Sequence, residues 1–596
     1  MRRMMMTLSG VALAAAAASL VVSSPHATEL RLPDFQSVEL SNGLKLYAAE
    51  DHTVPIVAFI VGLPYGGECD PPGKSGLASL TAKGCCNGVP GMDGTQVWLE
   101  MQRLGGGCET WSALDRTFFF VSSLSGTWED VLTLVARGIR TPTFPKRDVA
   151  RLRTAMVSDS KQERNRPGTL AARHAFNLLY DGRLGSPPSV ESARSISRDD
   201  LVRFHRTYYQ PKDAIVVAIG DFKPDRAIEV LRAAFEDWPQ GETPPEPPAS
   251  RLRVKGPHVR LVHKPGLTQA TIRCSQPGLR RVDPDHPAWG IANVALGGHF
   301  CSRLMTSLRS QGGKTYDAGS WNDCQMRQGQ IHISTFTRND QVGAAIDTIR
   351  NVLGAFARTG ITQEEMETAR SYILGSYYMI NLETLQQIRN GAAETLLNGR
   401  TLDEYRRDPA AFEAVTLEQT NRMATVHLRP EEMVWVVVGD KGKIGPALRR
   451  LGDYETVDYR EPLNPGNLIT RTRFGTGLTW NTTLRGGRLS LLYRQIDLFG
   501  SYGISPGYEP WERDGVAQAG IDWHRSSSEY SSGSLYLGAT GTVARPANGF
   551  SPHAGLRLFP NALGGHCSLS IEAGPNFWDR SGLYGLHAGL GVDWFF

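Results

Sequence analysis

The chain repeats one pattern at a fixed distance. Residues Phe204 to Asp221 read FHRTYYQPKDAIVVAIGD, and residues Val426 to Asp440 read VHLRPEEMVWVVVGD. In both segments a polar helix end leads to a proline, then to an apolar run of the strand type, then to a Gly-Asp pair. Pro211 and Pro430 lie 219 positions apart, and the Gly-Asp pairs share that separation. A common separation at two landmarks predicts a duplicated domain.

Proline and glutamate gather between the two copies, in residues 239–250 (PQGETPPEPPAS). This composition favours an extended, semi-rigid linker. We therefore expect one repeat over residues 28–238 and a second over residues 251–460. A chain of 596 residues has room for these two repeats and for a further domain.

Each repeat mixes strands with amphipathic helices. Val54 to Leu63 is a continuous apolar run that predicts a strand. Ser197 and Asp200 form a capping box at a helix start in the first repeat, and Thr416 and Gln419 repeat the device in the second. These patterns predict an α+β class, in which helices cover one side of each sheet.

The C-terminal segment, residues 465–596, predicts an all-β domain. Its apolar residues alternate with polar or small ones, as in the series Ala517, Ala519, Ile521 and Trp523. Strands of about ten residues fit a small outer-membrane β-barrel, which is apolar outside. A soluble β-sandwich alternates in the same way. The ending at Phe596 resembles the last strand of bacterial outer-membrane barrels, so we favour the barrel over the sandwich.

Residues 1–27 have the features of an export signal peptide, because Arg2 and Arg3 precede an alanine-rich apolar stretch. The expected location is therefore the periplasm, with anchoring in the outer membrane through residues 465–596. The net charge of +4 is too small to indicate nucleic-acid binding. The eight cysteines lack the spacing of a structural zinc site.

The first repeat opens NGLKLYAAEDHTVPIVAFIVGLPYGGECDPPGKSGLASLTAKGCCNGV from Asn42. This segment is similar to the pitrilysin and insulinase family of zinc peptidases, family M16, in its NGL opening, its apolar strand, its Asp-Pro turn and its G-x-A helix start. The resemblance covers about residues 38–457 and includes the two-repeat architecture. It implies two tandem M16-like α/β repeats.

In active M16 members the helix after G-x-A carries His-x-x-Glu-His, which holds zinc and activates water. The matching positions here are Ser79, Ala82 and Lys83. The third ligand, a glutamate in active members, falls near Asp159. No other His-x-x-Glu-His or His-Glu-x-x-His run occurs among the 14 histidines. The resemblance therefore implies that this chain holds no metal and no cofactor, and that it is not catalytic alone.

The second repeat keeps a different feature of the family. The run GGHFCSRLMTSLRSQGGKTY from Gly297 is similar to the M16 region that carries an Arg and a Tyr seven positions apart. In family members this pair grips the substrate backbone beside the zinc of the other domain. Arg309 and Tyr316 match the pair in type and spacing, so the resemblance implies a substrate-binding role for both. A guanidinium and a phenol are donors suited to a peptide carbonyl.

Three hypotheses follow. In the first, the chain is a non-catalytic subunit that binds peptide and completes the active site of a separate zinc-bearing M16-like partner. In the second, it is an inactive scaffold or peptide-binding protein at the outer membrane. The third, a hydrolase with another nucleophile, has little support, because no G-x-S-x-G elbow surrounds Ser79.

Overall fold

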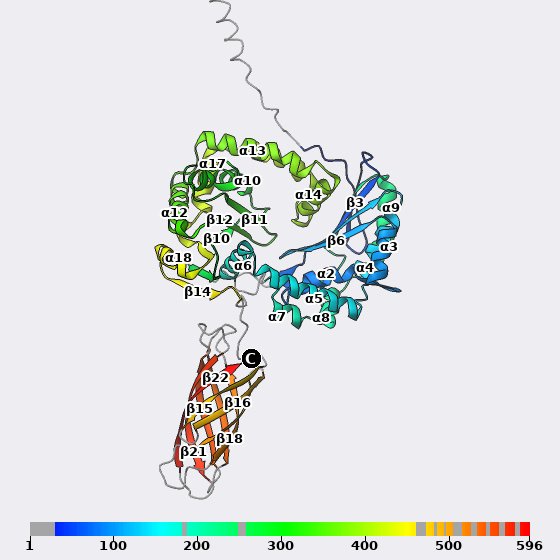
Figure 1. Cartoon of the computed structure of the whole chain (residues 1–596). Coiled ribbons are helices and arrows are strands. Elements are labelled where there is room, and N and C mark those ends of the chain that lie inside the picture. Colours follow the sequence, from blue (N-terminus) through cyan, green and yellow to red (C-terminus); the bar gives the residue numbers. More distant parts are fainter. Residues whose placement is uncertain are drawn as a thin grey trace, which may run out of the picture.

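The computed structural model describes residues 30–180, 187–247 and 258–460, together with eight strands between 473 and 595 (Figure 1). The predicted signal peptide, residues 1–27, lies outside the described residues. So do positions 248–250 of the predicted linker. In the described part, two halves each build a sheet covered by helices, and the strands after residue 472 form a separate unit.

The first sheet contains six described strands in the order β1-β2-β8-β3-β7-β6. They are β1 (Gln36–Glu39), β2 (Lys45–Glu50), β8 (Ile215–Gly220), β3 (Ile56–Leu63), β7 (Thr117–Leu124) and β6 (Gly107–Ser112). Strand β3 begins two residues later than the apolar run, after Pro55, which has no backbone N–H to give to a ladder. β4 (Gly88–Val89) and β5 (Met92–Asp93) form a small hairpin beside the sheet.

The second sheet has the same order, β14-β9-β13-β10-β12-β11, when read from the corresponding edge. Its strands are β9 (His258–His263), β10 (Gln269–Gly278), β11 (Ala318–Cys324), β12 (Gly329–Arg338), β13 (Val434–Gly439) and β14 (Tyr454–Asp458). The edge strands differ, because β1 runs antiparallel to β2 whereas β14 runs parallel to β9. A mixed α/β fold of two related halves results.

Helices pack on the outer face of each sheet. Around the first sheet they are α2 (Leu77–Cys85), α3 (Gly94–Arg103), α4 (Trp128–Arg140), α5 (Lys146–Glu163), α7 (Val190–Ser195), α8 (Arg198–Tyr208) and α9 (Pro224–Phe235). Around the second they are α10 (His286–Asn293), α11 (Arg303–Met305), α12 (Val342–Thr359), α13 (Gln363–Asn381), α15 (Leu402–Arg406), α16 (Asp408–Glu413), α17 (Leu417–His427) and α18 (Lys441–Leu448). The main cores of the two halves lie between these helices and the sheets.

The expectation that helices cover only one side of each sheet is wrong. Helix α6 (Pro167–Leu179) belongs to the first repeat in sequence but packs on the inner face of the second sheet, against Val434, Val436 and Val438. Helix α14 (Leu385–Leu397) crosses in the opposite direction and packs on the first sheet. The physical reason is that these inner faces carry apolar side chains, which water would otherwise contact.

The repeated helix start is confirmed at the atomic level. Helices α8 and α17 each begin with a reciprocal capping box. Asp200 N donates to Ser197 Oγ at 3.2 Å, and Gln419 N donates to Thr416 Oγ1 at the same distance. The two helices have equal length and are followed by strands β8 and β13 of equal length. The duplication therefore preserves both the caps and the strand that follows them.

The strands after residue 472 are β15 (Arg473–Asn481), β16 (Arg485–Tyr493), β17 (Ile496–Ile504), β18 (Gly515–Arg525), β19 (Gly533–Val543), β20 (Gly549–Leu558), β21 (Cys567–Trp578) and β22 (Tyr584–Phe595). Each pairs antiparallel with the next, and β22 pairs back with β15, so the strands form a closed ring. Of the described residues, none lie in a helix that is long and apolar enough to cross a membrane.

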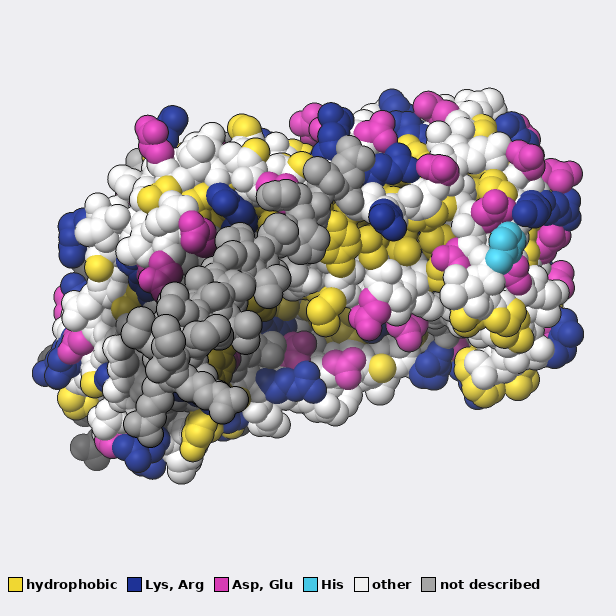
Figure 2. Space-filling view, turned by 90° about the horizontal axis from the view of Figure 1, so that it is seen from above, with side chains coloured by type: hydrophobic (Ala, Val, Ile, Leu, Met, Phe, Trp, Pro, Cys, Tyr) yellow, Lys and Arg dark blue, Asp and Glu magenta, His cyan; other side chains and the backbone are white. Residues whose placement is uncertain are grey.

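The surface of the two halves is mixed in character. Viewed from above, hydrophobic side chains gather near the middle of the visible face, and both signs of charge surround them (Figure 2). This distribution agrees with the nearly balanced numbers of basic and acidic residues, 64 and 60.

Candidate functional site

Helix α2 carries the positions that match the zinc motif. Ser79 and Lys83 are partly exposed on this helix, and the Ala82 methyl group is buried. None of these side chains offers the imidazole or carboxylate that zinc prefers. Asp159 lies on α5, which packs against α2, but its side chain is exposed. Within the described residues, no three His, Cys, Asp or Glu side chains are grouped so that they could hold a metal ion.

The start of α2 is built by Asp70 and Gly76. The Asp70 carboxylate accepts hydrogen bonds from Gly76 N at 2.6 Å and from Ala78 N at 2.7 Å, so it satisfies N–H groups that a helix start leaves free. Gly76 has a φ of 96°, and a Cβ there would lie 2.9 Å from Met156 Sδ. The Gly of the G-x-A start is thus required by the backbone and by packing, independently of any metal.

Two π-helical turns shape the corresponding region of the second half. They span Val294–Gly298 and Thr306–Ser310, on either side of α11. Such turns are rare and often occur at functional sites. Gly297 allows the first turn to approach the second sheet closely, because a Cβ on Gly297 would lie 2.5 Å from Ser320 N. Arg303 fixes the segment between the turns through two hydrogen bonds to Glu365, at 2.5 and 2.7 Å.

Arg309 and Tyr316 lie on and just after this segment. Arg309 lies in the second π-helical turn, and its guanidinium carbon is 4.5 Å from the centre of the Phe300 ring. The ring is exposed, so the contact is a cation–π interaction at the surface. Tyr316 comes just before β11, and 77% of its surface is exposed. Both side chains can therefore present donors to a ligand in solution.

A network at the seam between the halves was not expected from the sequence. Arg327, in the turn between β11 and β12, forms an ion pair with the buried Glu68 of the first half. Burial raises the pKa of Glu68 to about 7, although Arg327 opposes the shift. Met326 N donates to the Asp115 carboxylate beside it. Arg389, on the crossing helix α14, donates to the carbonyl oxygens of Phe59 and Val121 at 3.2 and 2.9 Å.

Sequence reasoning also missed a polar group on the inner face of the second sheet. Arg273, on β10, and Gln330, on β12, line a pocket beneath α6. His332 lies further along β12, where its Nδ1 is 3.2 Å from the carboxylate of Asp323 on β11. A single arginine inside the run QATIRCSQPG was the available signal, because a charged residue in an otherwise buried strand needs a reason.

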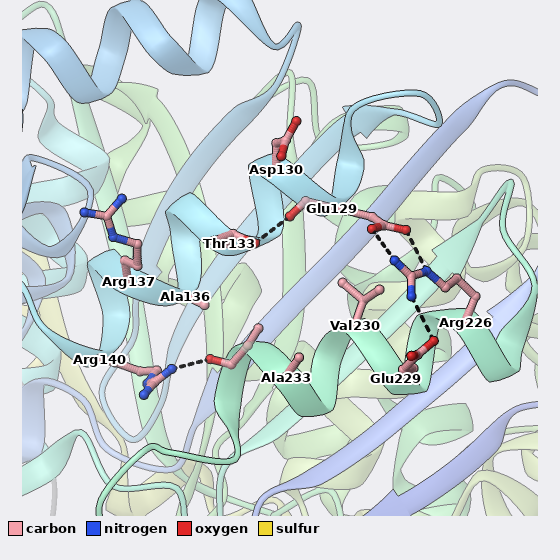
Figure 3. Close-up of a pocket in the computed structure, with 11 residues that line it drawn as sticks. Glu129, Asp130, Thr133, Ala136, Arg137, Arg140, Arg226, Glu229, Val230 and Ala233 are labelled. Atoms are coloured by element: carbon pink, nitrogen blue, oxygen red, sulfur yellow. Dashed lines mark hydrogen bonds and ion pairs between the residues drawn. The ribbon is translucent and has the colours of Figure 1, made fainter.

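Another groove lies on the outer face of the first half, between α4 and α9, with a volume of about 360 Å³. Three of its charged residues are paired with one another: Arg226 binds Glu129 through two hydrogen bonds at 2.9 and 2.7 Å and Glu229 through one at 2.8 Å (Figure 3). These bonds leave the Arg226 guanidinium little capacity to bind a ligand.

Comparison with known proteins finds a family match over part of the chain. Residues 195–373 match the family described as the peptidase M16 inactive domain. An uncharacterized zinc protease, YmxG, of Bacillus subtilis is 23% identical over 412 residues, 68% of this chain and 98% of the relative. A non-peptidase homolog, also named YmxG, of Helicobacter pylori is 23% identical over 408 residues, 66% of this chain and 91% of the relative.

Solved structures give the same fold. The peptidase M16 inactive domain from Pseudomonas fluorescens aligns with a TM-score of 0.63 at 23% identity, over 68% of this chain and 98% of that one. A protease from Helicobacter pylori aligns with a TM-score of 0.63 at 19% identity, over 68% of this chain and 100% of that one. Residues 195–373 therefore match an M16 inactive-type domain, and the two solved structures show the same fold over a longer part of the chain.

Proposed function

We propose that this chain is a non-catalytic M16-like subunit that binds peptide and completes the active site of a separate zinc-bearing M16-like peptidase. One observation carries the proposal. Arg309 and Tyr316 are available at the surface of the second half, whereas the motif positions on α2 hold side chains that cannot bind zinc.

The chemistry divides between the two subunits. Zinc in the partner would supply the activated water. The Arg309 guanidinium and the Tyr316 hydroxyl would hold the carbonyl of the peptide bond and stabilise the negative charge that develops on its oxygen. Because Tyr316 is so exposed, it can reach a ligand that lies between two proteins.

We further propose that the chain is exported to the periplasm and anchored in the outer membrane by residues 465–596. The support comes from the few side chains described in the ring of strands. Ile521 and Ile571 are 48% and 56% exposed, whereas His553 is only 4% exposed. An apolar exterior around a polar interior suits a bilayer and is the reverse of a water-soluble domain.

The alternative, an inactive scaffold or peptide-binding protein at the outer membrane, is favoured by one contact. Arg309 already stacks on Phe300 and so has a structural role without any substrate. In that case Arg309 and Tyr316 are dispensable for partner-dependent hydrolysis.

The test is affinity purification of the tagged full chain from solubilised membranes, followed by peptide hydrolysis with and without a zinc chelator. We expect a zinc-motif subunit to co-elute with chelator-sensitive activity. Arg309→Ala or Tyr316→Ala should lower that activity by about 100-fold, because each removes a transition-state donor. Arg338→Ala is the matched control, since Arg338 is an exposed arginine on the same half. A chain that elutes alone and cleaves nothing contradicts the proposal and leaves the scaffold role.

A further inference from the structure

A second polar site lies on the inner face of the second sheet. It is a pocket of about 220 Å³ lined by residues of α6, β10, β11 and β12 and of the turn between β11 and β12. We call it the Arg273 pocket. Its lining combines one cation, one carboxylate, three glutamine amides and two aromatic rings, contributed by Arg273, Asp323, Gln325, Gln328, Gln330, Phe176 and Tyr180.

Arg273 is a partly buried cation whose guanidinium forms no ion pair with a described residue. Its Nε is closed off from solvent without a hydrogen-bond partner, and Asp323 lies near it without bonding to it. Burial lowers the pKa of Arg273, although Asp323 lies near enough to oppose the shift. A partly buried guanidinium whose donors are not all satisfied is costly, so its presence in a folded protein is consistent with a ligand that accepts hydrogen bonds there.

The amides beside Arg273 are also unsatisfied. Gln330 is only 5% exposed, and its Nε2 has no hydrogen-bond partner. Neither Nε2 nor Oε1 of Gln328 has a partner, although both atoms are buried. Buried amides are normally hydrogen-bonded. Together they offer donors for a carboxylate or a carbonyl and one acceptor for an N–H group.

We propose that the Arg273 pocket binds the C-terminal residue of a peptide through its carboxylate. A guanidinium matches a carboxylate through two parallel hydrogen bonds, and Gln330 supplies a further donor. The Gln328 amide can pair with the main-chain amide of the same residue. Phe176 and Tyr180, whose ring centres are 4.5 Å apart, form an apolar wall for its side chain. The inference rests on the peptide binding proposed above.

The chemistry disfavours a phosphate group in this pocket. Arg273 is the only cation in the described lining, and Asp323 adds a negative charge close to it. Burial opposes ionisation of Asp323, but His332 and Arg273 lower its pKa overall, so the carboxylate stays charged. Because Asp323 already offsets the charge of Arg273, a doubly charged anion would be repelled more strongly than a singly charged carboxylate that hydrogen-bonds to the guanidinium.

The pocket and the Arg309/Tyr316 pair lie toward opposite ends of β11, an edge strand of the second sheet. Tyr316 and Asp323 are seven residues apart, which corresponds to about 20 Å in extended backbone. An edge strand can pair with an added peptide strand. A peptide held at Tyr316 would therefore reach the Arg273 pocket within about seven residues. The site would thus fix the number of residues between the peptide C-terminus and the residue that contacts Tyr316.

The test is direct binding of peptides to the purified full chain without a partner subunit. The probe is an N-terminally fluorescent decapeptide mixture, prepared with a free C-terminus and with a C-terminal amide, and read by fluorescence anisotropy. We expect the free carboxylate form to bind at least tenfold more tightly. Arg273→Gln should abolish this preference, and Gln330→Leu should reduce it. Arg338→Gln, a control on the same sheet, should keep it.

Thermal unfolding, a second variant and a competition experiment separate the possible outcomes. Arg273→Gln should not lower the melting temperature, because it removes an unpaired charge. Arg309→Ala should weaken both peptide forms equally, which separates this inference from partner-dependent hydrolysis. Equal binding of the two forms by the unmodified chain, or a preference that survives Arg273→Gln, overturns the proposal. Competition by free glutamate as strong as by the peptide also overturns it, because the pocket would then serve a small carboxylate.

Discussion

The inner faces of the two sheets have the same strand order but differ in character toward the edges formed by β6 and β11. The register aligns Ile215 of the first sheet with Val434 of the second, the same separation that the sequence repeat shows. In the next strands, Gly62 and Phe118 of the first sheet then correspond to Ser275 and His332 of the second.

The edge strands extend this correspondence. Trp111 stacks on Phe118 with ring centres 6.1 Å apart, and Trp321 stacks on His332 at 5.1 Å. Two residues before Gly62 on β3 and Ser275 on β10, buried Ile60 of the first sheet corresponds to Arg273 of the second. The two halves thus share the backbone, the crossing helix and the edge tryptophan, while the positions between them are apolar in the first half and polar in the second. The polar positions of the second half are the ones that the proposed peptide site uses.

The largest expected effect comes from exchanging Ile60 and Arg273. Ile60→Arg places an unpaired charge beneath α14, where Ile60 is fully buried, and should destabilise the chain by about 4 kcal/mol or more. Arg273→Ile should leave the stability unchanged or raise it by about 1 kcal/mol. Thermal and chemical unfolding of both variants measure the difference, with Ile60→Val as a control that should cost about 1 kcal/mol. Similar losses in both exchanges would mean that the two faces are equivalent.

The seam between the halves should weaken as pH rises. The pKa of Glu68 is about 7 in the folded chain, above its ordinary value of 4.5, so the folded state binds this proton more tightly than the unfolded chain does. The stability that this proton contributes is present below pH 4.5 and is lost as pH rises to about 7. We expect the melting temperature to fall between pH 5 and pH 8.

Glu68→Gln, which is always neutral, should flatten that profile by up to about 3 kcal/mol. The exposed Glu383→Gln is the matched control and should leave the profile as it is. If Glu68→Gln retains the full pH dependence, another group at the seam carries it.

The smallest expected effect tests the preserved part of the comparison. Ser197→Ala and Thr416→Ala each remove one side of a capping box with the same geometry. Each should cost about 1 kcal/mol, and the two costs should agree closely. Chemical denaturation of the full chain measures both. A large difference between the two costs would show that the two capping boxes do not contribute equally to the stability of the chain.

The repeat, the capping boxes and the mixed α/β class could be predicted because they depend on local signals. The separation of Pro211 and Pro430 and the Ser197–Asp200 pair mark the same helix and strand in both halves. The crossing of α6 and α14 could not be predicted, because an amphipathic helix shows that one face is buried but not which sheet buries it.

The candidate site, too, could be predicted only in part. The spacing of Arg309 and Tyr316 identified the pair, whereas the stacking of Arg309 on Phe300 depends on two π-helical turns with no sequence signature. Arg273 was missed because a single arginine in a strand does not reveal whether its face is exposed or covered. Only the register, together with the position of α6, places it beneath a helix.

The two crossing helices also set an order of events during synthesis. Helix α6 leaves the ribosome long before β13, the strand on which it packs, and the inner face of the first sheet must wait for α14. Neither half can therefore finish folding while the other is missing, and both present uncovered apolar surface in the interval. Such intermediates are prone to aggregation, so the two uncovered inner faces are the surfaces that a chaperone would have to protect until the second half arrives.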